Sequence, residues 1–293
     1  MNNKKLLVII DSVEFAKTAL LHAKTKAIKE NKSIDIAAFD YEETGNILFS
    51  LEPQQQLKIQ QSKLSELQVS LMPLIDEVLG ECEYDFQTLW HENPVEWLNE
   101  QVNVQSYEVV IKTRHIDEHQ QFNDLDWQLI RFSPIPLYLA ADNKWRNTSN
   151  VLAALDLGSK DDAKCALNEV IIEQAKRYAA SEKCKLHTCY TVHVSPLLRD
   201  LGIVFSDEQV VNAFDKLPEK QKDLILSHNI KEQLEIKAGI AEQVIPSLAA
   251  KYDANLVIIG AVKRSSIKSK LIGNTAEKVM RLLKTDLLIL PPV

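Results

Sequence analysis

The sequence predicts an α/β protein built from two tandem doubly wound parallel sheets, each of five strands in the order 3-2-1-4-5. Three observations lead to this fold class. Apolar segments of strand length alternate with longer segments whose apolar residues recur at helical spacing. The same succession of elements occurs in both halves of the chain. Several strands, among them LLVII, LVIIG and LLIL, are unbroken apolar runs, which is typical of parallel strands buried on both faces.

The length of 293 residues is about twice the ~150 residues expected of one domain. We therefore expect a first domain over residues 1–143 and a second over residues 149–293, joined by the polar segment ADNKWRNTSN. Each half is long enough to bury a core of its own.

The first half opens with the strand KKLLVII, which ends at Asp11, and continues with a helix that carries an alanine-rich apolar face. The elements after it are the strand SIDIAAFDY, a helix from about Glu52 to Leu79, the strand YDFQTLW, the helix NPVEWLNEQV, the strand YEVVIKT, the short helix DLDWQLIRF and the strand IPLYLAA.

The second half repeats this plan: its first strand, NVLAAL, ends at Asp156, and a helix with Ala163, Leu167 and Ile171 on one face follows. The later elements are the strand KLHTCYTVHV, a helical region from about Asp207 to His228, the strand KEQLEIKAG, the helix AEQVIPSLAAKY, the strand NLVIIGA, the helix TAEKVMRLLK and the strand DLLILPP. In such sheets, ligands bind outside the carboxyl ends of the strands, at the switch point between the first and fourth strands.

Composition excludes several classes of function. A net charge of -7 and a pI near 5.6 argue against nucleic acid as a partner, because phosphate-backbone binding needs an excess of Lys and Arg. No apolar run approaches the ~18 residues of a membrane span, and the N-terminal apolar run stops at Asp11, so we expect a cytoplasmic protein. The four cysteines form no C-x-x-C pair, which argues against a zinc ribbon or a redox motif.

The segment IIGAVKRSSIKSKLIGNTAEKVM has the layout of a phosphate-binding loop between a strand and a helix. Glycine allows a ligand to approach the backbone closely, and the free amides of a helix N-terminus bind phosphate. Lysines and an arginine add positive charge between the two glycines, and Asp156 can meet a base or ribose through its backbone and side chain. The candidate ligand-binding residues are Asp156, Gly260, Lys263, Arg264, Gly273, Asn274 and Thr275.

With these residues in view, the chain resembles tandem universal stress proteins, and most closely those of the E type. The family motif is G-x2-G-x9-G-[ST], and Gly260, Gly273 and Asn274-Thr275 match its spacing, with Lys263 at its second glycine. The E-type likeness lies in GNTAEKVMRLLKTDLLIL, FNDLDWQLIRFSPIPLYL and WHENPVEWL. The resemblance implies a Rossmann-like, flavodoxin-like fold in each half and a stress-response protein without established chemistry of its own. Some relatives of this kind bind ATP.

Each part of the motif has a second interpretation. Asp156 can cap the helix that follows it, and Asn274 stands three residues before Glu277, which is the spacing of a capping box. Lys263 either contacts a phosphate or fills the space that the motif glycine leaves open. We favour the second interpretation, because Arg264 and Lys268 can supply charge whereas nothing restores the lost space.

The first half lacks a phosphate-binding loop, since no glycine lies between Thr113 and Asp124. HIDEH, from His115 to His119, matches the H-x-x-E-H pattern of zinc peptidases. The match is short and no long amphipathic helix carries it, so we expect a solvated loop, with no metal site and no catalytic residues. Whether His115 and His119 bind a metal stays open.

We expect a non-catalytic binding and signalling protein whose second domain binds a small molecule, with ATP and Mg²⁺ as the candidate ligand. Two alternatives stay open: slow ATP hydrolysis in the second half, and a carrier that holds an apolar or lipid-like ligand in a cleft between the two halves. The apolar last strands, IPLYLAA and DLLILPP, are expected to face each other, which would make the chain an intramolecular pseudo-dimer. A homodimer of the whole chain also stays open, and the protein partners are unknown.

Overall fold

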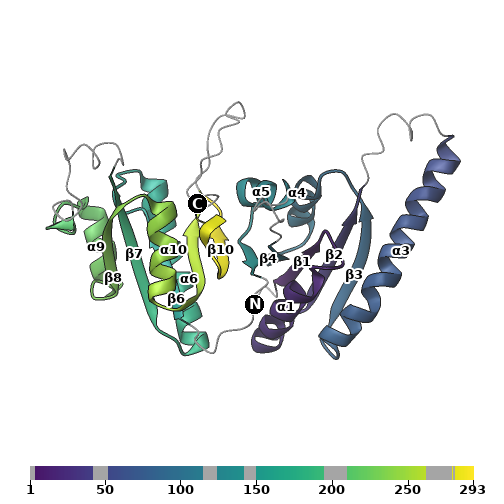
Figure 1. The fold of residues 1–293 in the computed structure, drawn as a ribbon, viewed down its shortest axis with the longest axis horizontal. Helices are drawn as coiled ribbons and strands as arrows, with labels where there is room; N and C mark the ends of the chain where they lie inside the picture. Colours follow the sequence, from purple (N-terminus) through teal and green to yellow (C-terminus); the bar gives the residue numbers. More distant parts are fainter. Residues whose placement is uncertain are drawn as a thin grey trace. The chain divides into compact units, whose positions relative to one another are not determined.

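Strands and helices alternate along both halves of the chain, as the sequence predicts (Figure 1). The computed structural model describes residues 4–41, 52–114, 124–141, 150–194, 210–261, 279 and 281–293. The chain divides into two units, Met1–Asp142 (unit 1) and Asn143–Val293 (unit 2), and each unit is treated by itself.

Unit 1 contains a parallel sheet whose strands lie in the order β3-β2-β1-β4-β5. Its strands are β1 (Lys5–Ile10), β2 (Ile34–Asp40), β3 (Tyr84–Trp90), β4 (Tyr107–Thr113) and β5 (Leu137–Ala140). Its helices are α1 (Ala16–Glu30), α3 (Pro53–Leu79), α4 (Pro94–Val104) and α5 (Asp124–Phe132). β1 is buried along nearly all of its length, as a central strand covered on both faces must be.

Unit 2 has the same topology, with its parallel strands in the order β8-β7-β6-β9-β10. Its strands are β6 (Asn150–Leu155), β7 (Leu186–His193), β8 (Leu234–Gly239), β9 (Ala254–Gly260) and β10 (Asp286–Leu290). Its described helices are α6 (Asp162–Glu182), α9 (Glu219–Ser227) and α10 (Ala241–Lys251). Numbered within each unit, both orders read 3-2-1-4-5, as predicted.

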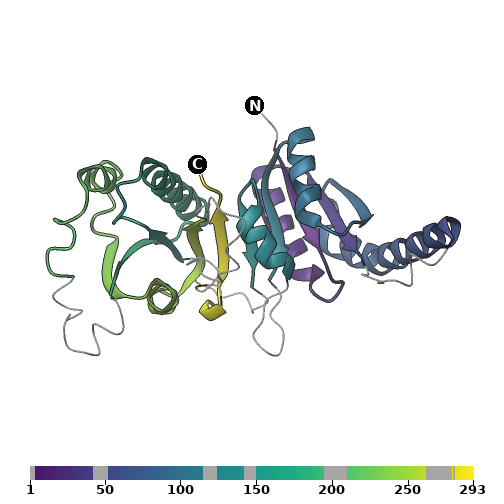
Figure 2. The same ribbon diagram turned by 90° about the horizontal axis from the view of Figure 1, so that it is seen from above.

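Helices cover both faces of each sheet (Figure 2). In unit 1, α1 packs against α3, and α4 packs against α5. In unit 2, α6 packs on β6 and β9 and contacts α9, whereas α10 packs on β7 and β9. This placement of the helices agrees with right-handed crossover connections between the strands. Such connections place their helices on opposite faces of the sheet on the two sides of the point where the strand order reverses. The first strand of each unit therefore ends at the switch point where ligands bind in this fold.

Local chemistry sets several helix ends. Glu52, the N-cap residue of α3, forms a capping box with Gln55, and Pro53 is the first residue of the helix. α3 extends from Pro53 to Leu79, as the sequence predicts. Asn93 caps α4, where its side chain accepts hydrogen bonds from two backbone amides. α1 ends at Glu30, and the C-cap residue after it, Asn31, has a left-handed φ of 52°. Asparagine adopts this conformation at a lower energetic cost than most residues do.

The helical region predicted from about Asp207 to His228 is interrupted in its described part. Val210 is helical and α9 extends from Glu219 to Ser227, but residues 211–216 between them form turns. Asn212 has a left-handed φ of 57°, and Pro218 adopts an extended conformation as the N-cap residue. Both conformations interrupt a helix, and the apolar spacing of this segment does not reveal either. Half of the predicted helix TAEKVMRLLK lies outside the described residues; in the other half Val279, Arg281 and Leu282 are helical, and Val279 is buried.

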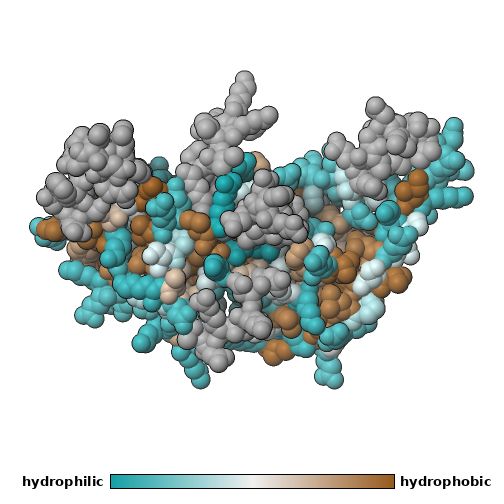
Figure 3. Space-filling model, viewed as in Figure 1, coloured by the Kyte–Doolittle hydropathy of each residue, from teal (hydrophilic) through white to brown (hydrophobic). Residues whose placement is uncertain are grey.

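The surface is mixed in polarity, with brown patches among teal ones on the face that Figure 3 shows. Large exposed apolar side chains include Ile28, Leu57 and Val69. Within the described part of the chain, no helix combines the length and the hydrophobicity that crossing a membrane requires.

Candidate functional site

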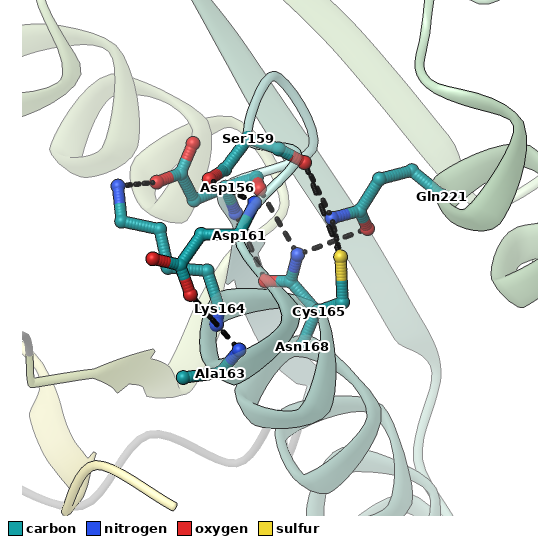
Figure 4. Close-up of polar contacts among 8 residues, drawn as sticks. All are labelled: Asp156, Ser159, Asp161, Ala163, Lys164, Cys165, Asn168 and Gln221. Atoms are coloured by element: carbon teal, nitrogen blue, oxygen red, sulfur yellow. Dashed lines mark hydrogen bonds and ion pairs between the residues drawn. The ribbon is translucent and has the colours of Figure 1, made fainter.

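The candidate site lies where β6 ends in unit 2, at the loop of residues 156–161, named here the Asp156 loop (Figure 4). The Asp156 side chain is 53% exposed, and its Oδ2 lies 2.8 Å from Nζ of Lys164 on α6. Among the described residues, the carboxylate therefore has one cationic partner and remains open to solvent. Exposed ion pairs of this kind are weak, so a ligand can compete for either partner.

Asn168, on the same helix, holds the backbone of Asp156. Its Oδ1 accepts a hydrogen bond from the Asp156 amide at 3.0 Å, and its Nδ2 donates to the Asp156 carbonyl oxygen at 3.0 Å. Asn168 is 2% exposed, so these bonds satisfy buried polar groups. The sequence suggested that the backbone of Asp156 could meet a ligand. The Asp156 amide already donates to Asn168, and contact between a ligand and this backbone stays a prediction.

Gln221, from α9, completes the network behind the loop (Figure 4). Its Oε1 accepts from Nδ2 of Asn168 at 3.1 Å, and its Nε2 donates to the Ser159 carbonyl oxygen at 3.2 Å. Nε2 also lies 3.0 Å from Sγ of Cys165. Gln221 is fully buried, and two side-chain amides from two helices thus fix the Asp156 loop at both Asp156 and Ser159.

The helix after the loop has its own cap. Oδ1 of Asp161 accepts from the amides of Ala163 at 2.9 Å and Lys164 at 3.2 Å. This satisfies two of the free amides at the start of α6. The alternative interpretation of Asp156 as the helix cap is therefore wrong, because Asp161 has that role.

Tyr190 of β7 closes one side of the Asp156 loop. A Cβ atom at Gly158 would lie 2.5 Å from the Tyr190 hydroxyl oxygen, so the loop approaches this side chain closely only because residue 158 is glycine. Burial raises the pKa of Tyr190, and the nearby Asp156 carboxylate raises it further. The phenol stays protonated at neutral pH and keeps a hydrogen to donate.

Gly260, at the end of β9, has a packing role in the structure. A Cβ atom there would lie 2.4 Å from Cδ2 of Leu167 and 3.3 Å from Cδ1 of Ile171, both on α6. The missing side chain thus allows α6 to pack against the end of β9. The predicted role of Gly260 in ligand approach stays a prediction, and this contact is a sufficient structural reason for the glycine.

The other predicted ligand-binding residues lie outside the described residues. These are Lys263, Arg264, Gly273, Asn274 and Thr275. The HIDEH segment, with His115 and His119, also lies outside them. Within the described part, no three His, Cys, Asp or Glu side chains are grouped to hold a metal ion, and all four cysteines are free.

Unit 1 has a different arrangement at the corresponding strand end. Lys112 of β4 is fully buried, and its Nζ lies 2.8 Å from Oδ2 of Asp11 and 2.8 Å from Oδ1 of Asp126 on α5. Burial alone would lower the pKa of Lys112, but the Asp126 and Asp11 carboxylates outweigh burial and raise it. Asp11, which corresponds to Asp156, thus faces an internal cation.

The strand registers show which residues replace each other. In each unit the first strand pairs with the fourth, and by this register Lys112 and Thr113 correspond to Ile259 and Gly260. Oγ1 of Thr113 accepts a hydrogen bond from the Ala19 amide on α1 at 2.9 Å, so a polar side chain fills the position of the glycine. Unit 1 therefore uses these positions for buried polar contacts of its own.

Sequence reasoning missed the residues that hold the Asp156 loop. Lys164 and Asn168 stand four positions apart and so share a face of α6, a signal that helical spacing contains. Gln221 had no such signal, because it lies on another helix. In unit 1, the lysine in the apolar strand YEVVIKT was the visible anomaly.

Sequence comparison finds relatives for both halves. Residues 148–291 match the model of the Universal stress protein family. Universal stress protein E of Salmonella typhi is 28% identical over 217 residues, which cover 71% of this chain and 68% of the relative. A universal stress protein E homolog of Haemophilus influenzae is 24% identical and covers 100% of this chain and 98% of the relative.

Solved structures with the same fold cover both units. A putative universal stress protein from Pseudomonas aeruginosa has a TM-score of 0.69 at 24% identity, covering 99% of this chain and 93% of its own. A universal stress protein from Archaeoglobus fulgidus has a TM-score of 0.62 at 15% identity, covering 99% and 97%. The second half of the chain thus matches the Universal stress protein family, and the chain as a whole is similar to universal stress protein E and has the length of a tandem protein of that type.

Proposed function

We propose that this chain is a non-catalytic stress-response protein whose unit 2 binds a nucleotide, ATP with Mg²⁺, outside the carboxyl ends of β6 and β9. One observation carries the proposal: the Asp156 carboxylate is exposed at the switch point, on a loop whose backbone is already held by Asn168 and Gln221. A site that is ordered before the ligand arrives loses less entropy on binding.

The chemistry of Asp156 fits the ribose or base of a nucleotide. A carboxylate at the end of a strand accepts hydrogen bonds from ribose hydroxyls in related doubly wound sheets. Oδ2 already has Lys164 as its partner, so a ligand hydroxyl has the other carboxylate oxygen available to it. The Tyr190 phenol on the neighbouring strand is a further donor close to the loop.

The phosphates would bind at the segment after β9. In this proposal Gly260, Gly273, Asn274 and Thr275 supply close backbone approach and free amides, and Lys263 and Arg264 lie between them. The sequence alone supports this part.

The two units differ in a way that favours one ligand per chain. Asp11 of unit 1 is bound to the buried Lys112, whereas the described cation beside Asp156 of unit 2 is the half-buried Lys164. A ligand in unit 1 would have to displace a cation that two carboxylates hold in the interior. We therefore propose binding in unit 2 alone.

Calorimetric titration with ATP and Mg²⁺ tests the proposal. We expect one ligand per chain and binding by Asp156→Ala at least about tenfold weaker, the loss of one hydrogen bond to a charged group. Glu173→Ala is the matched control, because it removes the same charge from an exposed carboxylate of α6 whose partner, Arg177, lies on the same helix. Absence of binding by the natural protein, or equal affinity in Asp156→Ala, would contradict the proposal.

Two further measurements address the other parts of the proposal. Phosphate release from ATP should be the same for the natural protein and Asp156→Ala, and faster release by the natural protein would indicate hydrolysis. Denaturing mass spectrometry of freshly purified protein reports any bound ligand. A co-purified apolar molecule in place of a nucleotide would favour a carrier of apolar ligands.

A further inference from the structure

A buried amide connects α9 to the candidate site. The buried residues of α9 are Gln221 and Ile225, and both are fully inaccessible to solvent. An amide in such a place costs free energy unless its donor and acceptor both find partners. An apolar residue would fill the space without that requirement, so the bonds of Gln221 call for an explanation beyond packing.

Both ends of the Gln221 amide reach the Asp156 loop. Nε2 donates directly to the carbonyl oxygen of Ser159, inside the loop. Oε1 accepts from Asn168, whose side chain bonds the amide and the carbonyl oxygen of Asp156. A continuous series of hydrogen bonds therefore runs from α9 to the backbone of the residue that would contact the ligand (Figure 4).

These hydrogen bonds restrict how the Asp156 loop can move. Asn168 can keep its bonds to Asp156 only while the loop stays in register with α6. Gln221 keeps an oxygen acceptor for Nε2 and a donor for Oε1 only while Ser159 and Asn168 both remain in reach, since its other neighbour, Sγ of Cys165, is a weak acceptor. A shift of the loop on ligand binding must move Gln221 with it or leave a buried amide unpaired, which is costly.

We propose that Gln221 is a positioning residue that couples occupancy of the Asp156 site to the attachment of α9. This inference rests on the proposed function, because it requires a ligand at Asp156. By linkage, a ligand that stabilises the loop stabilises the docked α9, and loss of docking weakens the ligand by the same factor. α9 is thus the element through which unit 2 reports whether its site is filled.

Amide hydrogen exchange on the full chain, with and without ATP and Mg²⁺, measures the protection of the Asp156 loop and of α9 in one experiment. The Asp156 amide is protected by Asn168 and the His228 amide by Leu224 of α9. In the natural protein ATP should slow exchange in α9. In ligand-free Gln221→Leu, the Asp156 amide should exchange about fivefold faster or more, while the amides of β6 keep their protection.

Two variants serve as controls. Gln221→Met keeps the length of the side chain but has no hydrogen to donate to Ser159, so it should behave as Gln221→Leu does even if the leucine variant folds poorly. Gln233→Leu changes an exposed glutamine in the turn before β8, where the backbone makes the hydrogen bonds, and it should match the natural protein.

The outcomes separate the inference from the proposed function. If the natural protein binds ATP, both Gln221 variants should bind it about fivefold more weakly or worse, and ATP should no longer protect α9. Variants that bind ATP and protect α9 as the natural protein does would overturn the coupling and leave the proposed function standing. Failure of the natural protein to bind ATP would instead overturn the proposed function. Unchanged exchange at Asp156 in the ligand-free variants would reject Gln221 as a positioning residue in either case.

Discussion

The ammonium of Lys112 lies 2.8 Å from a carboxylate oxygen of Asp126, and both side chains are buried in the interior of unit 1. Asp11 bonds the same ammonium at 2.8 Å. In unit 2 the corresponding strand end has an apolar residue in place of the lysine, and Asp156 reaches solvent. The two halves thus share a topology but use their switch points differently.

Replacing Lys112 by methionine should strongly destabilise unit 1. Methionine keeps most of the side-chain volume but removes the cation that lies between two carboxylates, and breaking a buried ion pair in this way typically costs ~3–5 kcal/mol. Urea unfolding followed by tryptophan fluorescence, to which the buried Trp97 of unit 1 contributes, measures the loss.

The control for this variant is Lys17→Met, which removes an exposed lysine paired with Glu77 at 3.3 Å. Its effect should stay within about 0.5 kcal/mol. Adding Asp126→Asn to Lys112→Met should restore part of the stability, since one of the two carboxylates that faced Lys112 loses its charge. Equal stability of Lys112→Met and Lys17→Met would show that the buried cluster does not hold unit 1 together.

Adding a methyl group at Gly260 should destabilise unit 2. The new Cβ would lie 2.4 Å from Cδ2 of Leu167, so Gly260→Ala forces β9 and α6 apart and should cost ~1–3 kcal/mol. The double variant Gly260→Ala/Leu167→Ala removes the clash, so its loss should be smaller than the sum of the two single losses. Strict additivity in thermal or urea unfolding would show that the two residues do not interact.

The same pair of variants tests the ligand role of Gly260. If close backbone approach matters, the double variant should bind ATP more weakly although its packing is restored. If the glycine serves packing alone, affinity should return with stability. Titration of the natural protein, Gly260→Ala and the double variant decides between the two.

A network on β8 predicts a pH dependence of stability. Glu235, 15% exposed, lies 2.6 Å from Lys251 and accepts a hydrogen bond from the Tyr252 hydroxyl. Burial alone would raise the pKa of Glu235, but the bonds from Lys251 and Tyr252 outweigh it and lower the pKa. A lowered folded-state pKa means that this stabilisation is present above about pH 4.5 and is lost as the pH falls through the folded pKa.

Glu235→Gln should therefore be less stable than the natural protein at pH 7, by up to about 1 kcal/mol, and the difference should shrink toward pH 3. Glu232→Gln, an exposed neighbour in the preceding turn, should match the natural protein at both values. A constant gap between Glu235→Gln and the natural protein across this range would contradict the assignment.

The fold could be predicted because its signals are local. Buried runs such as LLVII identify central strands, and Pro53 and Gly80 mark the ends of a long helix. The turns before α9 were not predicted, because they depend on the backbone conformations of Asn212 and Pro218. The spacing of apolar residues does not encode those conformations.

The candidate site could be predicted only in part, for a physical reason. Asp156 was visible because a carboxylate directly follows an apolar strand. Gln221 could not be identified, since its bond to Asn168 joins residues 53 positions apart and polar residues give no pattern at that distance. For Lys112 the sequence showed a charge in a buried strand but not which carboxylates would compensate it.

The substitution of lysine for the second motif glycine gives the sharpest test of nucleotide binding. Lys263 lies outside the described residues, so the prediction rests on the sequence. As a plug, Lys263 fills the space that the motif glycine leaves open, and Lys263→Gly should raise ATP affinity or create it. As a phosphate contact, its loss should weaken binding by the ~1.5–3 kcal/mol of a charged hydrogen bond.

Lys268→Gly supplies the matched control, because it removes the same charge from the same segment but at a position that the family motif does not restrict. We expect Lys263→Gly to bind ATP more tightly than the natural protein and Lys268→Gly to bind it more weakly, with added salt weakening all three since exposed charges are screened. Calorimetric titration with ATP and Mg²⁺ measures the affinities. Weaker binding in both variants would show that Lys263 contacts the ligand, because loss of charge would then outweigh the gain of space.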